Sequence, residues 1–349
     1  MIEVELRHCR IPLISPYVLS FGSVHHFDSL LCVMRHGQKE VVAEATALPG
    51  YSWETIGGMW NTAEQLIREC STLDLLTNRC KTHLHDSPFA ITPITTAIHK
   101  LLHPISYPDL SIPLVGIISG SAPAAIEQSV QTLQQEGFKT LKLKVAGKLD
   151  EDLEKLRVVG NTLQRDTIVR IDANQGYAVG DALRFVENLD PSWVELFEQP
   201  FKPDLWSETA ELNRRSPVPI MLDESIWTAE HIHRAMSDSC ARYVKLKMVK
   251  HGGFNETMRL LDLAQSLGIG VIFGNGVQTA IGCADEAVIY HLCGCNSTAE
   301  CNGWLKQAGD FTKGLVVESG NLRLSSSFAV DLATLEQWTV RSKMFKCYL

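Results

Sequence analysis

The feature that most constrains the fold is a series of eight short apolar segments that alternate with amphipathic helical segments. The apolar segments are PLVGIIS (113–119), TLKLKVA (140–146), TIVRID (167–172), WVELFEQP (193–200), VPIMLDES (218–225), ARYVKLK (241–247), GIGVIFGN (268–275) and STAEC (297–301). Strands that alternate with helices form parallel sheets, and eight such units predict a (β/α)₈ barrel. The expected fold class is therefore α/β, with a barrel of the TIM type.

The N-terminal part has a different order of predicted elements, in which strands come first and helices follow. Strand patterns occupy residues 1–13, 27–35 and 40–48, and helical periodicity follows at 53–70 and 88–103. This order predicts an α+β capping domain over residues 1–110, next to a barrel domain over residues 111–320. Residues 321–349 include the strand-like segment LRLS, and we expect this tail to pack back on the capping domain and complete it.

Composition and charge exclude several classes of function. The chain has 349 residues, a net charge of −8 and no run of Lys and Arg, which argues against a nucleic-acid surface. No apolar stretch is long enough to span a membrane, and the charged N-terminus lacks the apolar core of a signal peptide. Ten cysteines without framework spacing are expected to be reduced thiols in a cytoplasmic protein. The sequence leaves a homo-oligomer open.

Polar side chains collect at the carboxyl ends of five consecutive apolar segments. Asp172, Glu198 and Asp223 end three of them, Lys144 ends the segment before, and Lys247 ends the segment after. Their spacings lie between 24 and 28 residues, which is about one βα unit each. Because catalytic groups of such barrels lie at the C-terminal face of the strands, we expect these five side chains to converge there.

Three carboxylates in one pocket repel one another at neutral pH unless they share protons or a cation. Oxygen ligands without His or Cys favour Mg²⁺, with Mn²⁺ as the alternative, over Zn²⁺. The competing interpretation is that one or more of these carboxylates forms an ion pair with a barrel lysine. Three carboxylates at matching strand ends favour the metal site.

Lys144 and Lys247 flank the carboxylates along the strand order, which places them on opposite sides of a closed barrel. A lysine that is partly desolvated beside a cation has a lowered pKa and can serve as a general base. Lys142 and Lys245 lie two residues earlier on the same strands and face the same way. We expect them to perturb the neighbouring amines.

The motifs LKLKV, RIDANQGY, LFEQP, MLDES and VKLKMVKHGG, in this order, resemble the muconate-lactonizing enzyme subgroup of the enolase superfamily. The resemblance extends over the whole chain, from the capping domain through the order and spacing of the barrel motifs. In that superfamily a Lys or His base works with one or two Mg²⁺ ions that stabilise an enediolate. The resemblance therefore implies a small carboxylate substrate that loses the proton next to its carboxylate.

The resemblance also implies roles for individual residues. Asp172, Glu198 and Asp223 would bind Mg²⁺, and Lys144 and Lys247 would act as acid and base on the two faces of the substrate. Asn174 would support the metal ligands, and Lys142 would tune Lys144.

Substrate specificity in this family lies in two loops of the capping domain, which here are ISPYVLSFGSVHHF (14–27) and LPGYSWET (48–55). The candidates to close over the substrate are Tyr17, Phe21, His25, His26 and Tyr51. For the two histidines the alternative is a solvated position in a loop. Neither loop offers an Arg that would bind a second carboxylate.

The end of the eighth segment departs from the dipeptide epimerases of this subgroup, which usually carry Asp-x-Asp there to hold an ammonium group. This chain has Glu300 and Asn302 at that place, so one carboxylate is lost. The seventh segment carries Asn275 and Gln278 in a Gly-rich stretch. They are candidates to bind a substrate carboxylate beside a helix N-terminus, and the alternative is an ordinary tight βα turn.

Three functions remain open on the sequence. A racemase or epimerase of amino acid derivatives or dipeptides needs two opposed lysines. A muconate-type cycloisomerase, or an o-succinylbenzoate-type dehydratase, needs one base, with the second lysine acting electrostatically. A non-catalytic binding barrel is disfavoured by the intact ligands and lysines, and we favour the isomerases.

Overall fold

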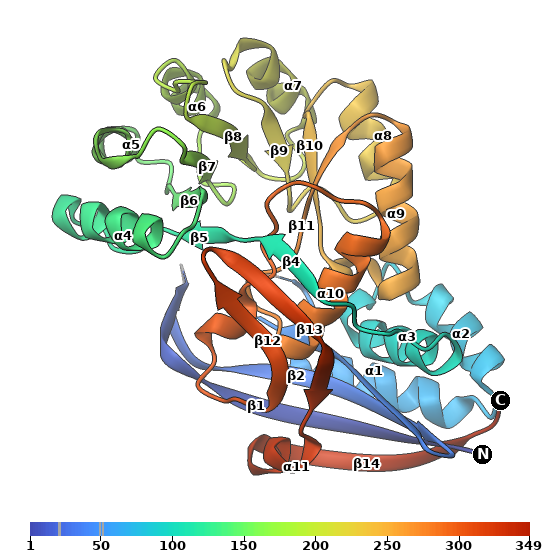
Figure 1. Cartoon of the computed structure of the whole chain (residues 1–349). Helices are drawn as coiled ribbons and strands as arrows, with labels where there is room; N and C mark the ends of the chain where they lie inside the picture. Colours follow the sequence, from blue (N-terminus) through green and yellow to red (C-terminus); the bar gives the residue numbers. More distant parts are fainter. Residues whose placement is uncertain (20–21, 49, 51) are drawn as a thin grey trace.

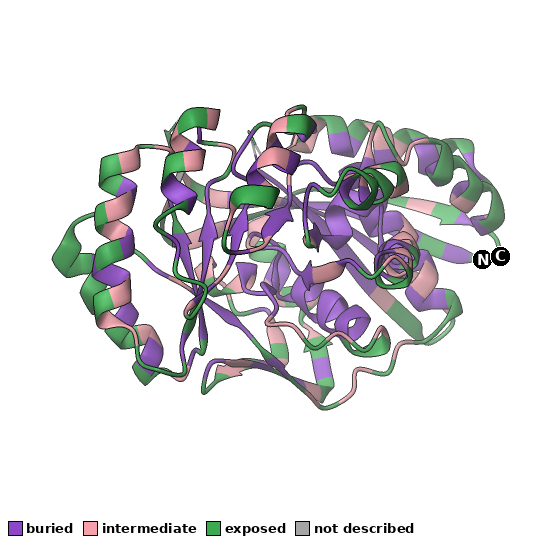
Figure 2. Cartoon of the chain, turned by 90° about the horizontal axis from the view of Figure 1, so that it is seen from above, coloured by how far each residue is buried: buried purple, intermediate pink, exposed green. Residues whose placement is uncertain are grey.

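The computed structural model describes residues 1–19, 22–48, 50 and 52–349. Its described strands form three sheets, of four, seven and three strands. The four-stranded sheet and its helices form one end of the molecule, and the seven-stranded sheet with its surrounding helices forms the other (Figure 1). Seen from above, buried residues concentrate on the strands and on the helix faces that pack against them (Figure 2).

The four-stranded sheet is antiparallel and has the order β14-β1-β2-β3. Its strands are β1 (Ile2–Leu19), β2 (Gly22–His36), β3 (Lys39–Ala47) and β14 (Thr339–Cys347). Alternation along β1 buries Ile2, Val4 and Leu6 completely. The helices α1 (Ile56–Glu69), α2 (Leu73–Thr82) and α3 (Pro88–Leu102) contribute to the same apolar cluster. Because β14 pairs with β1, the two termini lie side by side (Figure 1).

The seven-stranded sheet is parallel and follows the chain order. Its strands are β5 (Val115–Ile117), β6 (Thr140–Lys144), β7 (Ile168–Asp172), β8 (Val194–Glu198), β9 (Ile220–Leu222), β10 (Tyr243–Leu246) and β11 (Gly270–Phe273). The helices that accompany them are α4 (Pro123–Gln135), α5 (Leu149–Thr162), α6 (Val179–Val186), α7 (Trp206–Arg215), α8 (Ala229–Ser237), α9 (Phe254–Ser266) and α10 (Ala280–Leu292). The alternation predicted from the sequence is thus present.

The eighth apolar segment departs from the prediction of a complete (β/α)₈ barrel. In the described chain, residues 297–301 are not a strand and make a single bridge, between Leu114 and Ala299. Backbone hydrogen bonds join Ala299 to Val115 at one edge (3.0 Å) and Glu300 to Phe273 at the other (2.9 Å). The sheet is therefore barrel-like. The segment is too short for regular pairing on both sides, which is why alternation predicted a strand that the structure reduces to one bridge.

The third sheet has the order β12-β13-β4 and lies beside the barrel-like sheet. It consists of β4 (Leu110–Pro113), β12 (Thr312–Glu318) and β13 (Asn321–Val330). The remaining short elements are α11 (Leu332–Leu335) and the 3₁₀-helices η1 (Met248–His251), η2 (Gly303–Lys306) and η3 (Glu336–Trp338). The C-terminal tail thus divides, since β13 joins this sheet and β14 joins the N-terminal one. No described helix has the length and apolarity needed to cross a membrane.

The expected loop at residues 14–27 is largely a β-hairpin. Tyr17 pairs with Val24 and Leu19 pairs with Gly22, so β1 and β2 continue through most of this region. Aromatic and β-branched residues favour strands, which explains the extension. The register shifts between Pro12 and Tyr17, where the prolines have no N–H to donate to a ladder.

Helix α10 lies at the junction of the two parts of the molecule. It is buried on all sides from Ala280 to Tyr290, because it packs against α9 and against β3 of the N-terminal sheet. Glu44 on β3 accepts hydrogen bonds from the backbone N–H groups of Thr279 (2.6 Å) and Gly282 (3.1 Å) at the start of this helix. A carboxylate at a helix N-terminus satisfies donors that have no partner within the helix.

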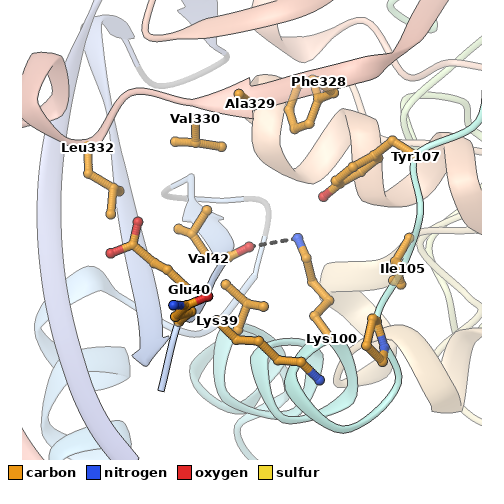
Figure 3. Close-up of a pocket in the computed structure, with 13 residues that line it drawn as sticks. Lys39, Glu40, Val42, Lys100, Ile105, Tyr107, Phe328, Ala329, Val330 and Leu332 are labelled. Atoms are coloured by element: carbon orange, nitrogen blue, oxygen red, sulfur yellow. Dashed lines mark hydrogen bonds between the residues drawn. The ribbon is translucent and has the colours of Figure 1, made fainter. Parts of the chain in front are cut away.

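A second buried contact joins the same two parts. Lys100 on α3 donates to the backbone oxygen of Val42 (2.7 Å) and to Asp285 on α10 (2.7 Å), and Tyr107 donates to the same carboxylate (2.8 Å). Figure 3 shows Lys100 reaching toward Val42 at a cavity of about 450 Å³. None of the strand-end residues predicted from the sequence lines this cavity, so it is separate from the candidate site.

We expect Glu44 to make stability fall as pH rises through the weakly acidic range. Burial raises the pKa of Glu44 from an ordinary 4.5 to about 7, so the unfolded chain loses this proton first. The contribution is complete below about pH 4.5 and is lost as pH rises to about 7. Urea unfolding of wild type and Glu44→Gln between pH 5 and 7.5 should show wild type losing stability relative to the variant.

Glu3→Gln is the matched control, because Glu3 is an exposed glutamate on the same sheet. Its pH profile should parallel that of wild type. Parallel profiles for wild type and Glu44→Gln would contradict the assignment.

Candidate active site

Four buried side chains from alternate barrel positions form a closed ring of ion pairs, which we call the charged layer. Its members are Lys142 on β6, Glu198 on β8, Lys245 on β10 and Glu300 in the eighth segment. Lys142 lies 2.8 Å from Glu198 and 3.0 Å from Glu300. Lys245 lies 3.0 Å from Glu198 and also pairs with Glu300. Barrel interiors are filled by layers of four side chains from alternate strands, and here such a layer alternates in charge.

Burial and neighbouring charges shift the pKa values of the two glutamates in the charged layer in opposite directions. Burial tends to raise the pKa of Glu300, but Lys142 and Lys245 outweigh it and lower the pKa far below the ordinary value. Burial and then Asp172 raise the pKa of Glu198 to about 7. Glu198 Oε2 accepts no hydrogen bond, although it lies within ion-pair distance of Lys142.

The remaining strand-end residues surround this layer. Lys144 is paired in register with Asp172, which is paired with Glu198 on the next strand. Asp172 lies 2.9 Å from Lys142, and Asp223 lies 2.5 Å from Lys247. The structure therefore brings the three predicted carboxylates to one end of the sheet, each in contact with a barrel lysine. These ion pairs correspond to the alternative raised for the sequence, in which the carboxylates pair with barrel lysines.

The turns after β7 and β8 hold these carboxylates in place. The backbone N–H of Asn174 donates to Asp172 (2.9 Å), and its side chain donates to Glu224 (3.2 Å). Gln199 has a positive φ of 38° and accepts hydrogen bonds from the backbone N–H groups of Asp223 (2.9 Å) and Ser225 (3.2 Å). Gln199 was not among the residues predicted from the sequence, although its place in the LFEQP motif next to Glu198 was an available signal.

Lys250 was also missed. Its ammonium donates to the backbone oxygen of Asp223 (2.7 Å), lies 3.3 Å from the Asp223 carboxylate and sits over the Trp227 ring (4.5 Å). Trp227 packs against Trp53 of the N-terminal part, with ring centroids 4.5 Å apart and ring planes tilted by 42°. Lys250 therefore connects a predicted metal ligand to the capping region. Its position three residues after Lys247 was the available sequence signal.

The pKa values of Lys142 and Lys247 are raised, whereas a lowered pKa was expected for a catalytic lysine such as Lys247. Burial alone lowers them, but Asp172, Glu198 and Glu300 raise the pKa of Lys142 well above its ordinary value. Asp223 and then Glu224 raise the pKa of Lys247 above its ordinary value. The sequence-based expectation of a lowered pKa counted a neighbouring cation, whereas the contacts in this structure are carboxylates.

The donor chemistry of the three carboxylates fits a hard divalent cation. Asp172, Glu198 and Asp223 offer oxygen atoms only, and one oxygen of Glu198 is buried without a hydrogen bond. In the described chain no group of three or more Asp, Glu, His or Cys side chains is arranged to hold a metal. The ammonium groups of Lys142 and Lys247 lie against these carboxylates, so a cation would have to replace their ion pairs.

The predicted substrate-binding residues of the last two segments are buried near the charged layer. Asn275 accepts from Val277 N–H (3.1 Å), Gln278 accepts from Thr46 N–H (3.2 Å), and Asn302 donates to Val115 O (3.1 Å). Each keeps one buried polar atom without a hydrogen bond in the described structure, namely Asn275 Nδ2, Gln278 Nε2 and Asn302 Oδ1. Buried polar atoms normally have a hydrogen-bond partner, so a water molecule or a bound group could satisfy these three.

The capping-region residues that were predicted to close over the substrate lie in different environments. Tyr17 packs edge-on against Phe27, in a cluster that includes Val277 after β11. His25 is exposed and makes no hydrogen bond with a described residue, and His26 lies 3.5 Å from Asp28. Both histidines lie on strand β2 and not in a loop, with His25 exposed and His26 partly buried. Two further predicted residues, Phe21 and Tyr51, lie outside the described residues.

We expect the charged layer to be strongly coupled in folding. Lys245→Met leaves Glu300 and Glu198 with one fewer cation and should lower the free energy of unfolding by about 3 kcal/mol. Adding Glu300→Gln should cost less than the sum of the single changes, with a coupling of at least about 1 kcal/mol. Urea unfolding of the four proteins measures this coupling.

Lys139→Met is the control, since Lys139 pairs with Asp166 on the surface with more than half of each side chain exposed. Such pairs contribute about 0–1 kcal/mol. Additive effects of the two changes in the layer would show that its members act independently.

Comparison with known proteins places this architecture in a family. The family model described as "Enolase C-terminal domain-like" matches residues 124–327, more than half of the chain. The o-succinylbenzoate synthase of Geobacillus kaustophilus is 25% identical over 376 aligned positions, covering 98% of this chain and 96% of that protein.

Two solved structures share the fold. The N-succinyl Arg/Lys racemase of Bacillus cereus ATCC 14579 has a TM-score of 0.86 at 19% identity, with 99% of both chains covered. The muconate lactonizing enzyme of Pseudomonas fluorescens, complexed with muconolactone, has a TM-score of 0.84 at 22% identity, covering 96% of this chain and 98% of that one. The chain therefore belongs to the enolase superfamily, in its group of muconate-lactonizing-enzyme-like and mandelate-racemase-like proteins.

Proposed function

We propose that this protein is an isomerase that removes the proton next to a substrate carboxylate and returns a proton at a second position or face. The observation that carries the proposal is the position of Lys144 and Lys247. They lie at the ends of β6 and β10, and the three strands between them carry the carboxylates Asp172, Glu198 and Asp223. A substrate held at the carboxylates would have one lysine on each side.

Asp172, Glu198 and Asp223 are the proposed ligands of Mg²⁺, with Mn²⁺ as the alternative. When bound, the ion would stabilise the negative charge that develops as the carbon next to the substrate carboxylate loses its proton. Asn174, Gln199 and Lys250 hold these ligands through the hydrogen bonds described above, so we assign them positioning roles.

The two lysines decide between the reactions. In a racemase or epimerase, each amine removes the proton from one enantiomer and returns it to the other. In a cycloisomerase, one amine handles the proton and the other stabilises charge. The family contains both kinds of enzyme, as the racemase and the muconate lactonizing enzyme compared above illustrate.

A dehydratase is the second candidate. The relative named o-succinylbenzoate synthase aligns along almost the whole chain, and that reaction also needs a single base beside an activated carboxylate. A non-catalytic barrel is disfavoured, because the three carboxylates and Lys247 are buried at one end of the sheet and Lys144, although exposed, lies beside Asp172 at the same end.

Proton exchange tests the proposal without knowledge of the natural substrate. Wild type with Mg²⁺ in D₂O, incubated with N-acyl amino acids, dipeptides, muconate and the o-succinylbenzoate precursor, should introduce deuterium into at least one compound. In a racemase, Lys144→Ala and Lys247→Ala should each stop exchange of one enantiomer, and either change should stop racemisation. Mass spectrometry and chiral chromatography measure the two effects.

In a cycloisomerase or dehydratase, only one of the two substitutions should abolish proton transfer. Lys155→Ala, a lysine on the outer helix α5, is the control and should leave exchange intact. Exchange that survives in the double variant Lys144→Ala/Lys247→Ala would eliminate both mechanisms.

Calorimetry of Mg²⁺ binding tests the proposed metal ligands directly. Asp223→Asn should weaken Mg²⁺ binding at least tenfold by calorimetry, because even supporting groups of metal ligands contribute about 10–100-fold. Asp204→Asn, on the exposed loop after β8, is the matched control. Equal affinity in Asp223→Asn and wild type would remove Asp223 from the ligand set.

A further inference from the structure

Glu286 is a buried carboxyl group of α10 that the proposed chemistry does not use. Its side chain is completely buried. One oxygen accepts a hydrogen bond from the backbone N–H of Met248 (3.1 Å), and the other accepts from the backbone N–H of Asn275 (3.2 Å). Met248 directly follows Lys247 after β10, and Asn275 lies shortly beyond the end of β11. A single side chain therefore connects the chain segments that follow two neighbouring strands.

These contacts begin where the backbone pairing of β10 and β11 ends. The pairing finishes with a hydrogen bond from Gly274 N–H to Leu246 O (3.1 Å). Beyond it, neither Met248 N–H nor Asn275 N–H donates to a backbone oxygen of the described chain. A buried N–H without an acceptor is costly, so Glu286 supplies the two acceptors that the sheet no longer provides.

Hydrogen bonds fix both peptide planes that flank Lys247. The preceding plane is held by the bond to Leu246 O. The following plane is held at the N–H of Met248, which donates to Glu286. The oxygen of the same plane, which belongs to Lys247, accepts from Lys250 N–H (2.9 Å). Because each peptide unit is planar, these contacts together determine the direction in which the Lys247 side chain leaves the backbone.

The same carboxyl group holds the turn that carries Asn275. The preceding residue, Gly274, has a φ of 116°, and a Cβ atom there would lie 2.7 Å from the backbone of the eighth segment. The turn is therefore packed where only glycine fits. The Asn275 side chain accepts from Val277 N–H (3.1 Å) and keeps its Nδ2 buried without a hydrogen bond. Glu286 thus fixes the backbone from which this predicted substrate-binding amide projects.

Helix α10 provides a rigid support for Glu286. The helix packs on all sides against other elements, and Glu44 of β3 accepts hydrogen bonds from two N–H groups at its start. A group carried on a packed helix is held more precisely than one carried on a loop. The position of the carboxyl group is therefore set by the helix and not by the two turns that it contacts.

We propose that Glu286 is a positioning residue, whose carboxyl group fixes the backbone that carries Lys247 and Asn275 and so directs both side chains at the end of the barrel-like sheet. The inference rests on the proposed function for the part of Lys247 in proton transfer. The backbone contacts do not depend on that function, so amide exchange and kinetics test the two proposals separately.

Amide hydrogen exchange, followed by NMR, tests the contacts. In wild type the amides of Met248 and Asn275 should be protected, because Glu286 accepts from both. Glu286→Gln keeps the size of the side chain but offers one oxygen. At least one of the two amides should then exchange about fivefold faster or more, relative to the amide of Val244 within β10.

The kinetics of deuterium exchange test the positioning role, with a compound that wild type exchanges. Glu286→Gln should lower kcat by about 10- to 100-fold, because a misplacement of about 1 Å has effects of this size. KM should stay close to the wild-type value, since the proposed metal ligands are unchanged. Glu286→Asp keeps both oxygens on a shorter side chain, and it should lie between wild type and Glu286→Gln in both measurements.

Asp285→Asn is the matched control. Asp285 is the neighbouring buried carboxylate on α10, and it pairs with Lys100 away from the site. This change should lower stability and accelerate the exchange of all three amides together, while kcat keeps its wild-type value. The same uniform acceleration in Glu286→Gln would assign Glu286 to stability alone and overturn the inference. Fast exchange of the Met248 and Asn275 amides in wild type would also overturn it.

The combined outcomes separate the two proposals. Selective acceleration of the Met248 or Asn275 amide in Glu286→Gln, without deuterium in any compound, would support the role of Glu286 and contradict the isomerase. Deuterium exchange by wild type with an unchanged kcat in Glu286→Gln would support the isomerase and overturn the role of Glu286.

Discussion

The charged layer is the interaction on which the rest of the site depends. Lys142, Glu198, Lys245 and Glu300 are buried at the centre of the barrel-like sheet and neutralise one another in a closed ring. A buried ion pair offsets its desolvation only where geometry is good and remaining polar atoms have partners. A ring in which every charge has two opposite neighbours meets that condition more fully than isolated pairs do. It also ties one predicted metal ligand, Glu198, to the eighth segment.

The charged layer also helps to hold the eighth segment, which is too short to be a regular strand. Glu300 anchors this segment through side-chain ion pairs, while Ala299 and Glu300 make backbone bonds to the neighbouring strands. Ion pairs thus hold this segment in the sheet, as backbone pairing holds the regular strands. The same contacts neutralise the buried Glu300 carboxylate.

The capping region is joined to the barrel-like part by polar contacts as well as by packing. Glu44 caps α10, Lys100 binds Asp285 on that helix, and β1 holds the backbone next to Lys306. The first two contacts each place a buried charged group of one part against backbone or side-chain groups of the other, and the third joins backbone to backbone. The two parts are therefore joined by polar contacts at several separate places. Tyr17 lies near Lys306, and Trp53 lies against Trp227, which lies beside Lys250.

Much of the site was predictable from the sequence, for a physical reason. Strand ends in a parallel sheet share one edge, so Asp172, Glu198, Asp223, Lys144 and Lys247 were expected together from spacing alone. The direction of side chains along a strand likewise predicted that Lys142 and Lys245 face the interior. Local patterns of this kind depend only on chain geometry, which neighbouring residues determine.

Tertiary structure alone decided which charges meet across the sheet. The pairing of Lys142 and Lys245 with Glu300 depends on how the last segment docks between β5 and β11, and alternation in the sequence overstated its regularity. Lys306 lies in a 3₁₀-turn without periodicity, and its surroundings come from Gly276 and β1, which are distant in the chain. Sequence patterns determined which residues reach one end of the barrel. Contacts between segments far apart in the chain determined which of them form ion pairs, because ion pairing depends on distances that only the folded chain sets.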